Sequence, residues 1–309
     1  MTRTLGGVLP IVHTPFLTDD TIDAVSLQRQ IDWALASGAA GLCMGMVSEL
    51  LRLTHRERLE LTAMIAEMSA GRGLVIAGVG AESTKQALEY ACAARVSGCD
   101  AMMAIPPVST ALPGEQLLEY FATLAESVDL PLIVQDASGY VGRPIPLEVC
   151  IQLLDRFGPD KILFKPESNP VGPRLSALRE ASGGRARIFD GSGGLSLVDC
   201  YRRGIAGTMP GMEFLEGIVA LWTALQHGDE RAIYRLYLPI CALVSLQLQA
   251  GLDGFLAIEK YVLAKRGLFE TDVRRKPYAW EMDEETRREL ERLLEQLDAA
   301  LREHDPRRK

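Results

Sequence analysis

The stretch Lys161-Ile162-Leu163-Phe164-Lys165-Pro166-Glu167 joins a short apolar run to a lysine at its end. Pro166 is expected to end the strand and to keep the residue after it from donating a backbone hydrogen bond. An amine at the carboxyl end of a buried strand is partly removed from water, which favours its neutral form as a nucleophile toward a carbonyl. Taken alone, Lys165 is more typical of a strand-end lysine whose stem packs on the sheet. The rest of the chain decides between these two interpretations.

Eight short apolar runs, each followed by an amphipathic segment of helical length, fill the first 225 residues or so. Apolar runs that alternate with helices indicate a parallel sheet buried on both faces. Eight such units fit a closed barrel of ~250 residues better than a doubly wound sheet. The sequence therefore predicts an α/β fold, a (β/α)8 TIM barrel, as one domain over residues 1–227. The expected strands are 7–12, 41–45, 74–78, 101–106, 130–135, 162–165, 187–189 and 207–212.

The strands stop after residue 227, and residues 228–309 are predicted to form a C-terminal extension of three helices, over 229–250, 252–266 and 283–303. The first two are apolar enough to pack on the barrel or on a partner subunit. The third alternates charges of both signs, which is typical of a solvated helix face. The basic end at 307–309 is expected to be a frayed tail.

Composition excludes several classes of protein. The chain has 309 residues, 48% of them hydrophobic, with a formal net charge of −8. It has no basic stripe of the kind that binds nucleic acid. No run approaches the ~18 apolar residues of a membrane span, and no signal-peptide pattern opens the chain. The six irregularly spaced cysteines predict buried free thiols in a reducing compartment, so we expect a cytoplasmic protein.

The carboxyl ends of the strands hold the active site of a (β/α)8 barrel. Lys165 is the only lysine among the eight predicted strand ends. The four histidines are dispersed, and only His13 falls near a strand end, where it is interpreted as a core-edge residue. We therefore predict no metal and no cofactor. A lysine in this place without metal ligands is what imine formation with a 2-keto acid requires, so a catalytic Lys165 is now favoured.

Several short motifs, in this order and spacing, resemble the dihydrodipicolinate synthase/N-acetylneuraminate lyase superfamily of class I Schiff-base lyases. The resemblance covers residues 7–300 and implies a (β/α)8 barrel with a C-terminal helical extension, a homotetramer, and an imine-forming lysine at Lys165. The matching residues are Thr14-Pro15-Phe16, Ile22-Asp23, Gly45-x-x-x-Glu49, Leu53-Thr54, Glu57-Arg58, Ala77-Gly78, Ser83-Thr84, Pro106, Leu130-Pro131, Lys165 and Gly191.

The chain departs from the dihydrodipicolinate synthase pattern where that pattern places its reactive hydroxyls. Met46 and Val47 replace two threonines, Val108 and Gln135 replace two tyrosines, and Tyr140 replaces an arginine. A proton relay cannot run through Met, Val and Gln side chains, because none of them titrates. These departures argue against synthesis of dihydrodipicolinate.

The replaced motifs resemble instead the branch of the superfamily that contains L-2-keto-3-deoxyarabonate dehydratase. Leu50 and Val108 stand where that branch tends to have glutamine and tyrosine, which leaves the substrate open. The motifs that carry this resemblance are Gly41-Leu42-Cys43, Ser48-Glu49, Pro106-Pro107, Val134-Gln135-Asp136-Ala137 and Phe164-Lys165-x-Glu167.

The chemistry expected of such a site starts from a lysine imine at the C2 ketone of a 2-keto-3-deoxy sugar acid. The protonated imine acidifies C3, and a base removes a C3 proton. In a dehydratase the C4 hydroxyl then leaves as water. In an aldolase the C3–C4 bond breaks and pyruvate is released. The substrate carboxylate is expected on backbone N–H groups of Met46, Val47 and Ser48, with the Ser48 hydroxyl as the best side-chain donor.

Four further polar groups are candidates at the strand ends. Glu167 is either an acid/base or an exposed carboxylate that leads a helix. Gln135 and Asp136 are expected to hydrogen-bond substrate hydroxyls, although Asp136 is almost as well explained as a loop cap. Glu49 is expected to tie down its own loop through backbone N–H groups.

The glycine-rich loop with Gly191 and Ser192 is a further candidate for substrate binding. Such loops occur at barrel phosphate sites, which keeps a phosphorylated substrate as a minor alternative. A regulator that binds a keto acid without turnover is the alternative from another functional class. The polar groups that converge on Lys165 favour the enzyme.

Overall fold

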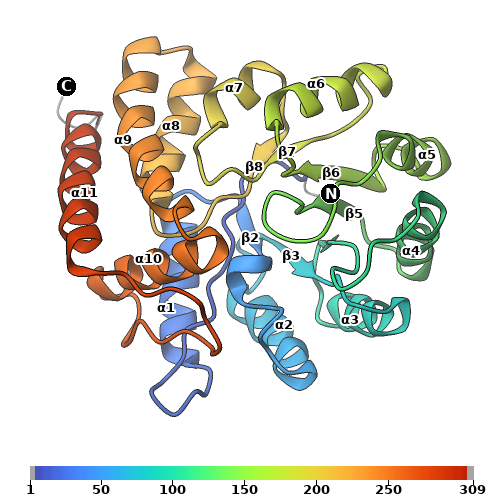
Figure 1. Cartoon of the computed structure of the whole chain (residues 1–309), viewed down its shortest axis with the longest axis horizontal. Coiled ribbons are helices and arrows are strands. Elements are labelled where there is room, and N and C mark those ends of the chain that lie inside the picture. Colours follow the sequence, from blue (N-terminus) through green and yellow to red (C-terminus); the bar gives the residue numbers. More distant parts are fainter. Residues whose placement is uncertain (1–3, 305–309) are drawn as a thin grey trace.

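A computed structural model describes residues 4–304 of the chain as alternating strands and helices around a central ring (Figure 1). The strands are β1 (Gly7–Val8), β2 (Gly41–Cys43), β3 (Leu74–Gly78), β4 (Ala101–Ala104), β5 (Leu132–Asp136), β6 (Ile162–Pro166), β7 (Phe189–Asp190) and β8 (Gly207–Thr208). The barrel helices are α1 (Ala24–Ala36), α2 (His55–Ser69), α3 (Thr84–Val96), α4 (Gly114–Ser127), α5 (Leu147–Phe157), α6 (Val171–Ala181), α7 (Leu197–Arg202) and α8 (Leu215–His227). All eight predicted strand–helix units are present.

The strands form two parallel arcs that two bridges join. One arc has the order β1-β8-β7 and the other β2-β3-β4-β5-β6. Ile11 bridges to Cys43 and Phe164 bridges to Ile188, both in parallel, which connects the arcs at both ends. The predicted (β/α)8 barrel is confirmed, with its strand ends collected at one mouth.

Apolar side chains fill the barrel and separate it from the helices. The inside is occupied by buried residues that point inward from the strands and their flanks, among them Leu9, Ile76, Met103, Leu163 and Phe189. A larger apolar cluster lies outside the strands and continues into the C-terminal helices. The barrel interior is therefore a packed core and not a pore, and this core fixes the positions of the strand ends.

The extension consists of α9 (Glu230–Leu248), α10 (Gly251–Lys265) and α11 (Glu284–His304), as predicted. Helix α9 packs between α8 and α11, while α10 contacts the short 3-10 turn η1 (Met46–Ser48) that follows β2 (Figure 1). Packing on the barrel, one of the two expected arrangements, is therefore observed. The division at residues 227/228 stays a prediction, and 307–309 lie outside the described residues.

The key strand ends at Pro166, as expected, but the expectation that the residue after it donates no backbone hydrogen bond is wrong. Strand β6 includes Pro166, which lies opposite Asp136 of β5. The backbone N–H of Glu167 donates to the Asp136 carbonyl oxygen at 2.8 Å. Proline removes only its own N–H, so the ladder continues on either side of it. This continuation fixes the backbone of Glu167 next to β5.

The expectation that the six cysteines are buried is only partly correct. All six are free, and Cys43, Cys99 and Cys200 are buried, but Cys150 and Cys241 are half-buried and Cys92 is exposed. No helix within residues 4–304 has the length and apolar character needed to cross a membrane.

Candidate active site

A cavity opens at the carboxyl ends of the strands and contains Lys165. Its wall combines strand-end residues with residues from the loop after β5 and from α10. Three of the predicted site residues, Ser48, Asp136 and Ser192, are absent from the wall. The predicted residues that do line it are Met46, Val47, Gln135, Lys165, Glu167 and Gly191.

Lys165, Glu167 and Gln135 form a compact polar group, called here the strand group. Lys165 is only 3% exposed, and its Nζ lies 3.5 Å from Oε1 of Glu167. Nε2 of Gln135 donates to Oε2 of Glu167 at 2.5 Å. Gln135 and Lys165 are register partners on neighbouring strands, so the ladder itself places the three side chains together. Glu167 is buried beside the lysine, which excludes the exposed helix-leading carboxylate.

Burial governs the ionisation of Glu167. Desolvation raises the pKa of Glu167, while the Lys165 ammonium and the hydrogen bond from Gln135 oppose that rise. A carboxylate whose pKa is raised is a better proton acceptor from the neighbouring ammonium. Glu167 is therefore a candidate proton acceptor in the cavity.

Gly191 lies so close to Lys165 and Glu167 that the position has no room for a side chain. A Cβ there would lie 2.4 Å from Cε of Lys165 and 2.3 Å from Oε1 of Glu167. Any substitution must displace the lysine, the glutamate or both. The glycine thus permits the close approach of the loop after β7 to the strand group.

The loop after β2 is locked to the segment after β1. The Ser48 hydroxyl donates to the Val12 carbonyl oxygen at 2.5 Å and accepts from the Gly45 N–H at 3.1 Å. Ser48 is fully buried, so the expectation that its hydroxyl binds the substrate carboxylate does not fit its position. Met46 and Val47 begin the 3-10 turn, where N–H groups have no partner within the helix. Their N–H groups remain suitable for a carboxylate.

Asp136 and Ser192 serve their own loops. The Asp136 carboxylate accepts from the N–H groups of Ser138 and Ile145, at 3.1 and 3.0 Å. The Ser192 hydroxyl accepts from the Ser196 N–H at 2.9 Å. The substrate-binding role expected for Asp136 and Ser192 is not supported, since these polar atoms are engaged away from the cavity. The loop-cap interpretation of Asp136 fits its contacts.

Glu49 binds the C-terminal part of the chain, not its own loop as expected. Oε2 accepts from the Arg275 N–H at 2.8 Å, and Oε1 forms a buried ion pair with Lys260 of α10. Lys260 also donates to the Val273 carbonyl oxygen at 2.8 Å. The sequence-based expectation considered only neighbours of Glu49 in the chain, and these partners lie more than two hundred positions further along it. Glu49 couples the loop after β2 to the extension.

Helix α10 contributes a wall of the cavity that sequence reasoning missed. Leu252, Phe255 and Glu259 line it together with Tyr140, whose ring meets that of Phe255 edge-on at 5.9 Å. The helical spacing of Leu252, Phe255 and Glu259 is visible in the sequence, but the same spacing is equally typical of a helix that only packs against the barrel. Nothing local indicated that this face points at Lys165.

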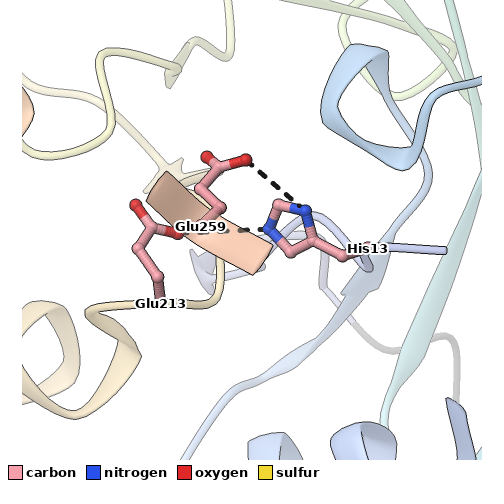
Figure 2. A group of neighbouring side chains, drawn as sticks. All are labelled: His13, Glu213 and Glu259. Carbon is pink, nitrogen blue, oxygen red and sulfur yellow. Dashed lines mark ion pairs between the residues drawn. The ribbon is translucent and has the colours of Figure 1, made fainter. Parts of the chain in front are cut away.

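Glu259 belongs to a second polar group, called here the extension group, with His13 and Glu213 (Figure 2). Nδ1 of His13 lies 3.4 Å from Oε2 of Glu259, and Nε2 lies 4.0 Å from Oε2 of Glu213. All three side chains are at most 2% exposed. Burial, then the charge of Lys260, lowers the pKa of His13 to about 3, so its ring is neutral. Burial raises the pKa of Glu213 to about 7.

Three ligand-type side chains invite the question of a metal ion. The N–H of Met212 donates to Nε2 of His13 at 3.4 Å, which occupies the lone pair of that nitrogen. The tautomer then carries its proton on Nδ1, the nitrogen that faces Glu259. The described contacts thus favour a proton in this group over a cation.

The barrel and its mouth define the class: a (β/α)8 barrel with a buried lysine at the end of the sixth strand, paired with a carboxyl group. The model of the dihydrodipicolinate synthetase family matches residues 4–297, and the chain belongs to this family.

Individual relatives divide between two activities. The chain is 28% identical to the L-2-keto-3-deoxyarabonate dehydratase of Azospirillum brasilense over 300 residues, 94% of each protein. It is 33% identical to the 4-hydroxy-tetrahydrodipicolinate synthase of Laribacter hongkongensis over 136 residues, which cover 44% of this chain and 47% of that enzyme.

Solved structures agree on the fold. Dihydrodipicolinate synthase from Rhodopseudomonas palustris superposes with a TM-score of 0.85 at 27% identity, covering 94% of this chain and 97% of that one. The 4-hydroxy-tetrahydrodipicolinate synthase from Methylacidiphilum fumariolicum superposes with a TM-score of 0.87 at 22% identity, covering 98% and 99%. The fold is thus shared over 94–98% of this chain.

Proposed function

We propose that the protein is a Schiff-base-forming dehydratase of a 2-keto-3-deoxy sugar acid, of the L-2-keto-3-deoxyarabonate type. The observation that carries this proposal is the buried Lys165–Glu167 pair, at 3.5 Å, in a cavity lined by Met46, Val47 and Gln135 at positions where the synthase pattern has two threonines and a tyrosine. The extended similarity to a dehydratase supports the same choice.

The strand group can carry the first half of the reaction. A proton moves from Lys165 to Glu167, and the free amine attacks the C2 ketone. The addition gives a carbinolamine with a hydroxyl at C2. Glu167 returns the proton to this hydroxyl, which leaves as water and gives the protonated imine. The carboxylate so formed then accepts a C3 proton, and an enamine results. Loss of the C4 hydroxyl completes the dehydration.

The substrate would be held at its two ends. Its carboxylate would lie on the N–H groups of Met46 and Val47 at the start of the 3-10 turn. Gln135 would bind a hydroxyl through the amide oxygen that its contact with Glu167 leaves open. The lysine suits a ketone and these N–H groups suit a carboxylate, and together they support a 2-keto acid as the substrate.

A pyruvate-releasing aldolase is the second candidate, because it needs the same imine and the same lysine. The two reactions part only at C3 and C4, where the aldolase breaks the carbon–carbon bond. The products therefore distinguish them directly.

The test is to incubate the protein with pyruvate and, separately, with five- and six-carbon 2-keto-3-deoxy sugar acids, then reduce with borohydride. Mass spectrometry should find the adduct on the peptide with Lys165, and product analysis should find the dehydrated keto acid. A Lys165→Arg variant should keep the fold and lose both adduct and turnover by at least about 10⁴-fold, since guanidinium stays protonated.

Each other outcome selects a different function. Release of pyruvate identifies the aldolase, and an adduct without turnover identifies a keto-acid-binding regulator. Absence of any adduct on Lys165 removes the Schiff-base proposal altogether.

A further inference from the structure

Glu259 is a carboxyl group that reaches the reaction cavity from the C-terminal extension. It lies on α10, is 1% exposed, and lines the same cavity as Lys165 and Glu167. Its Oε2 has no hydrogen-bond partner among residues 4–304. A buried polar atom without a partner costs free energy, and a catalytic role is one explanation for its presence.

The groups around Glu259 favour a proton on it. Glu213 after β8 and Glu49 after η1 add negative charge, and Tyr140 and the neutral His13 add none. Lys260 is the nearest positive charge, but it is paired with Glu49 and bonded to Val273. No lysine or arginine in the described part of the chain lies within ion-pair distance of Glu259. Burial, then Glu213 and Glu49, raise its pKa well above the ordinary value, and Lys260 opposes them.

Glycine at position 211 allows the two carboxyl groups to approach each other. A Cβ there would lie 2.2 Å from Oε2 of Glu213 and 2.6 Å from Oε1 of Glu259. Carboxyl groups this close in a dry site cannot both be ionised. Figure 2 shows the His13 ring on one side of both carboxyl groups, with the two nitrogens facing different carboxyl groups.

We propose that Glu259 is a further catalytic residue: a carboxylic acid that donates its proton to the C4 hydroxyl of the substrate as that group leaves. This inference rests on the proposed dehydratase function. His13 is then a positioning residue, because its Nδ1–H faces Oε2 of Glu259 and stabilises the carboxylate that the donation leaves behind.

The step balances without a further reactant. The enamine electrons form the C3–C4 double bond, the C4–O bond breaks with its electron pair on oxygen, and the proton of Glu259 completes a water molecule. Glu167 meanwhile holds the proton taken from C3. Water in the cavity carries that proton to Glu259 and hydrolyses the imine, which restores Lys165. The extension group thus supplies an acid that is separate from the base in the strand group.

The main test compares Glu259→Gln with the wild type on a 2-keto-3-deoxy sugar acid and on its 4-fluoro analogue. We expect kcat for dehydration to fall about 10²–10⁴-fold, the usual contribution of a general acid. Elimination of fluoride, which leaves without a proton, should stay within about tenfold of the wild type. Adduct formation with pyruvate and C3 deuterium exchange of that adduct should also persist, since Lys165 and Glu167 are intact.

Two further variants separate proton donation from structural support. Glu259→Asp keeps the acid and should recover part of the lost dehydration. Glu213→Gln changes a neighbour outside the cavity wall and removes a negative charge, so the pKa of Glu259 should fall. The wild-type rate should decline as pH rises through the pKa of Glu259, and Glu213→Gln should move this decline to lower pH.

Three results would overturn the assignment of Glu259. These are dehydration by Glu259→Gln at near wild-type rate with an unchanged pH profile, equal loss of water and fluoride elimination, and a stoichiometric divalent ion in the purified protein that Glu259→Gln removes. A wild-type protein that forms the Lys165 adduct but never dehydrates shows instead that the proposed function has failed, and the role of Glu259 falls with it.

Discussion

The two polar groups at the cavity differ in how the chain assembles them. The strand group comes from two neighbouring strands, and its atoms meet at 2.5 and 3.5 Å with opposite charges available. The extension group brings together the segments after β1 and β8 with helix α10, at 3.4 and 4.0 Å, with two carboxyl groups and a neutral imidazole. In the strand group a lysine opposes the rise that burial causes in the pKa of Glu167, whereas in the extension group Glu213 adds to the rise that burial causes in the pKa of Glu259. Through Glu167 and Glu259, both groups reach the same cavity at the barrel mouth.

Among variants that disturb one of the two polar groups, Glu167→Gln is expected to have the largest effect on catalysis. The amide fills the same space but cannot take the proton of Lys165 or of C3, so kcat should fall about 10²–10⁴-fold. Deuterium exchange at C3 of the pyruvate adduct should fall by a similar factor, and the rate of imine trapping should drop as well.

Glu259→Gln is the matched control for that experiment, because it changes a buried carboxyl group of the same cavity. It should leave the exchange at C3 intact. Wild-type exchange in Glu167→Gln would show that the base lies elsewhere and that the strand group only holds the lysine in place.

The sequence allowed the strand group to be predicted and not the extension group, for a physical reason. Strand order and the period of two place Lys165 and Glu167 at a barrel mouth, and the register brings Gln135 beside them. Glu259 needs the packing of α10 against η1, a tertiary contact that no local pattern encodes. The same limitation misplaced Ser48 and Asp136, whose polar atoms were expected to face substrate but are used by neighbouring backbone.

The contact that holds α10 at the barrel gives the next largest effect. Lys260 is fully buried, pairs with Glu49, and lies 4.3 Å from the centre of the Phe16 ring. Lys260→Met leaves the Glu49 carboxylate without its cation, and removing one partner of such a pair costs about 3–5 kcal/mol. Urea unfolding should show this loss in the free energy of unfolding.

A double variant distinguishes lost pairing from poor packing. Glu49→Gln combined with Lys260→Met should recover part of that loss, since no unpaired charge remains. A single variant that loses less than about 1 kcal/mol would mean that α10 is held by its apolar face alone. The extension group would then not depend on the buried pair.

The smallest effect on catalysis is expected from Ser48→Ala, and it discriminates between the two interpretations of this residue. The hydroxyl links Val12 to Gly45, so its loss leaves two buried backbone groups without a partner and costs about 1–3 kcal/mol of stability. If backbone N–H groups alone hold the substrate carboxylate, KM should change less than about threefold. A rise in KM of tenfold or more at unchanged stability would instead return Ser48 to the binding site. Ser192→Ala, which removes a loop hydroxyl with a single backbone contact, provides the comparison and should cost less stability.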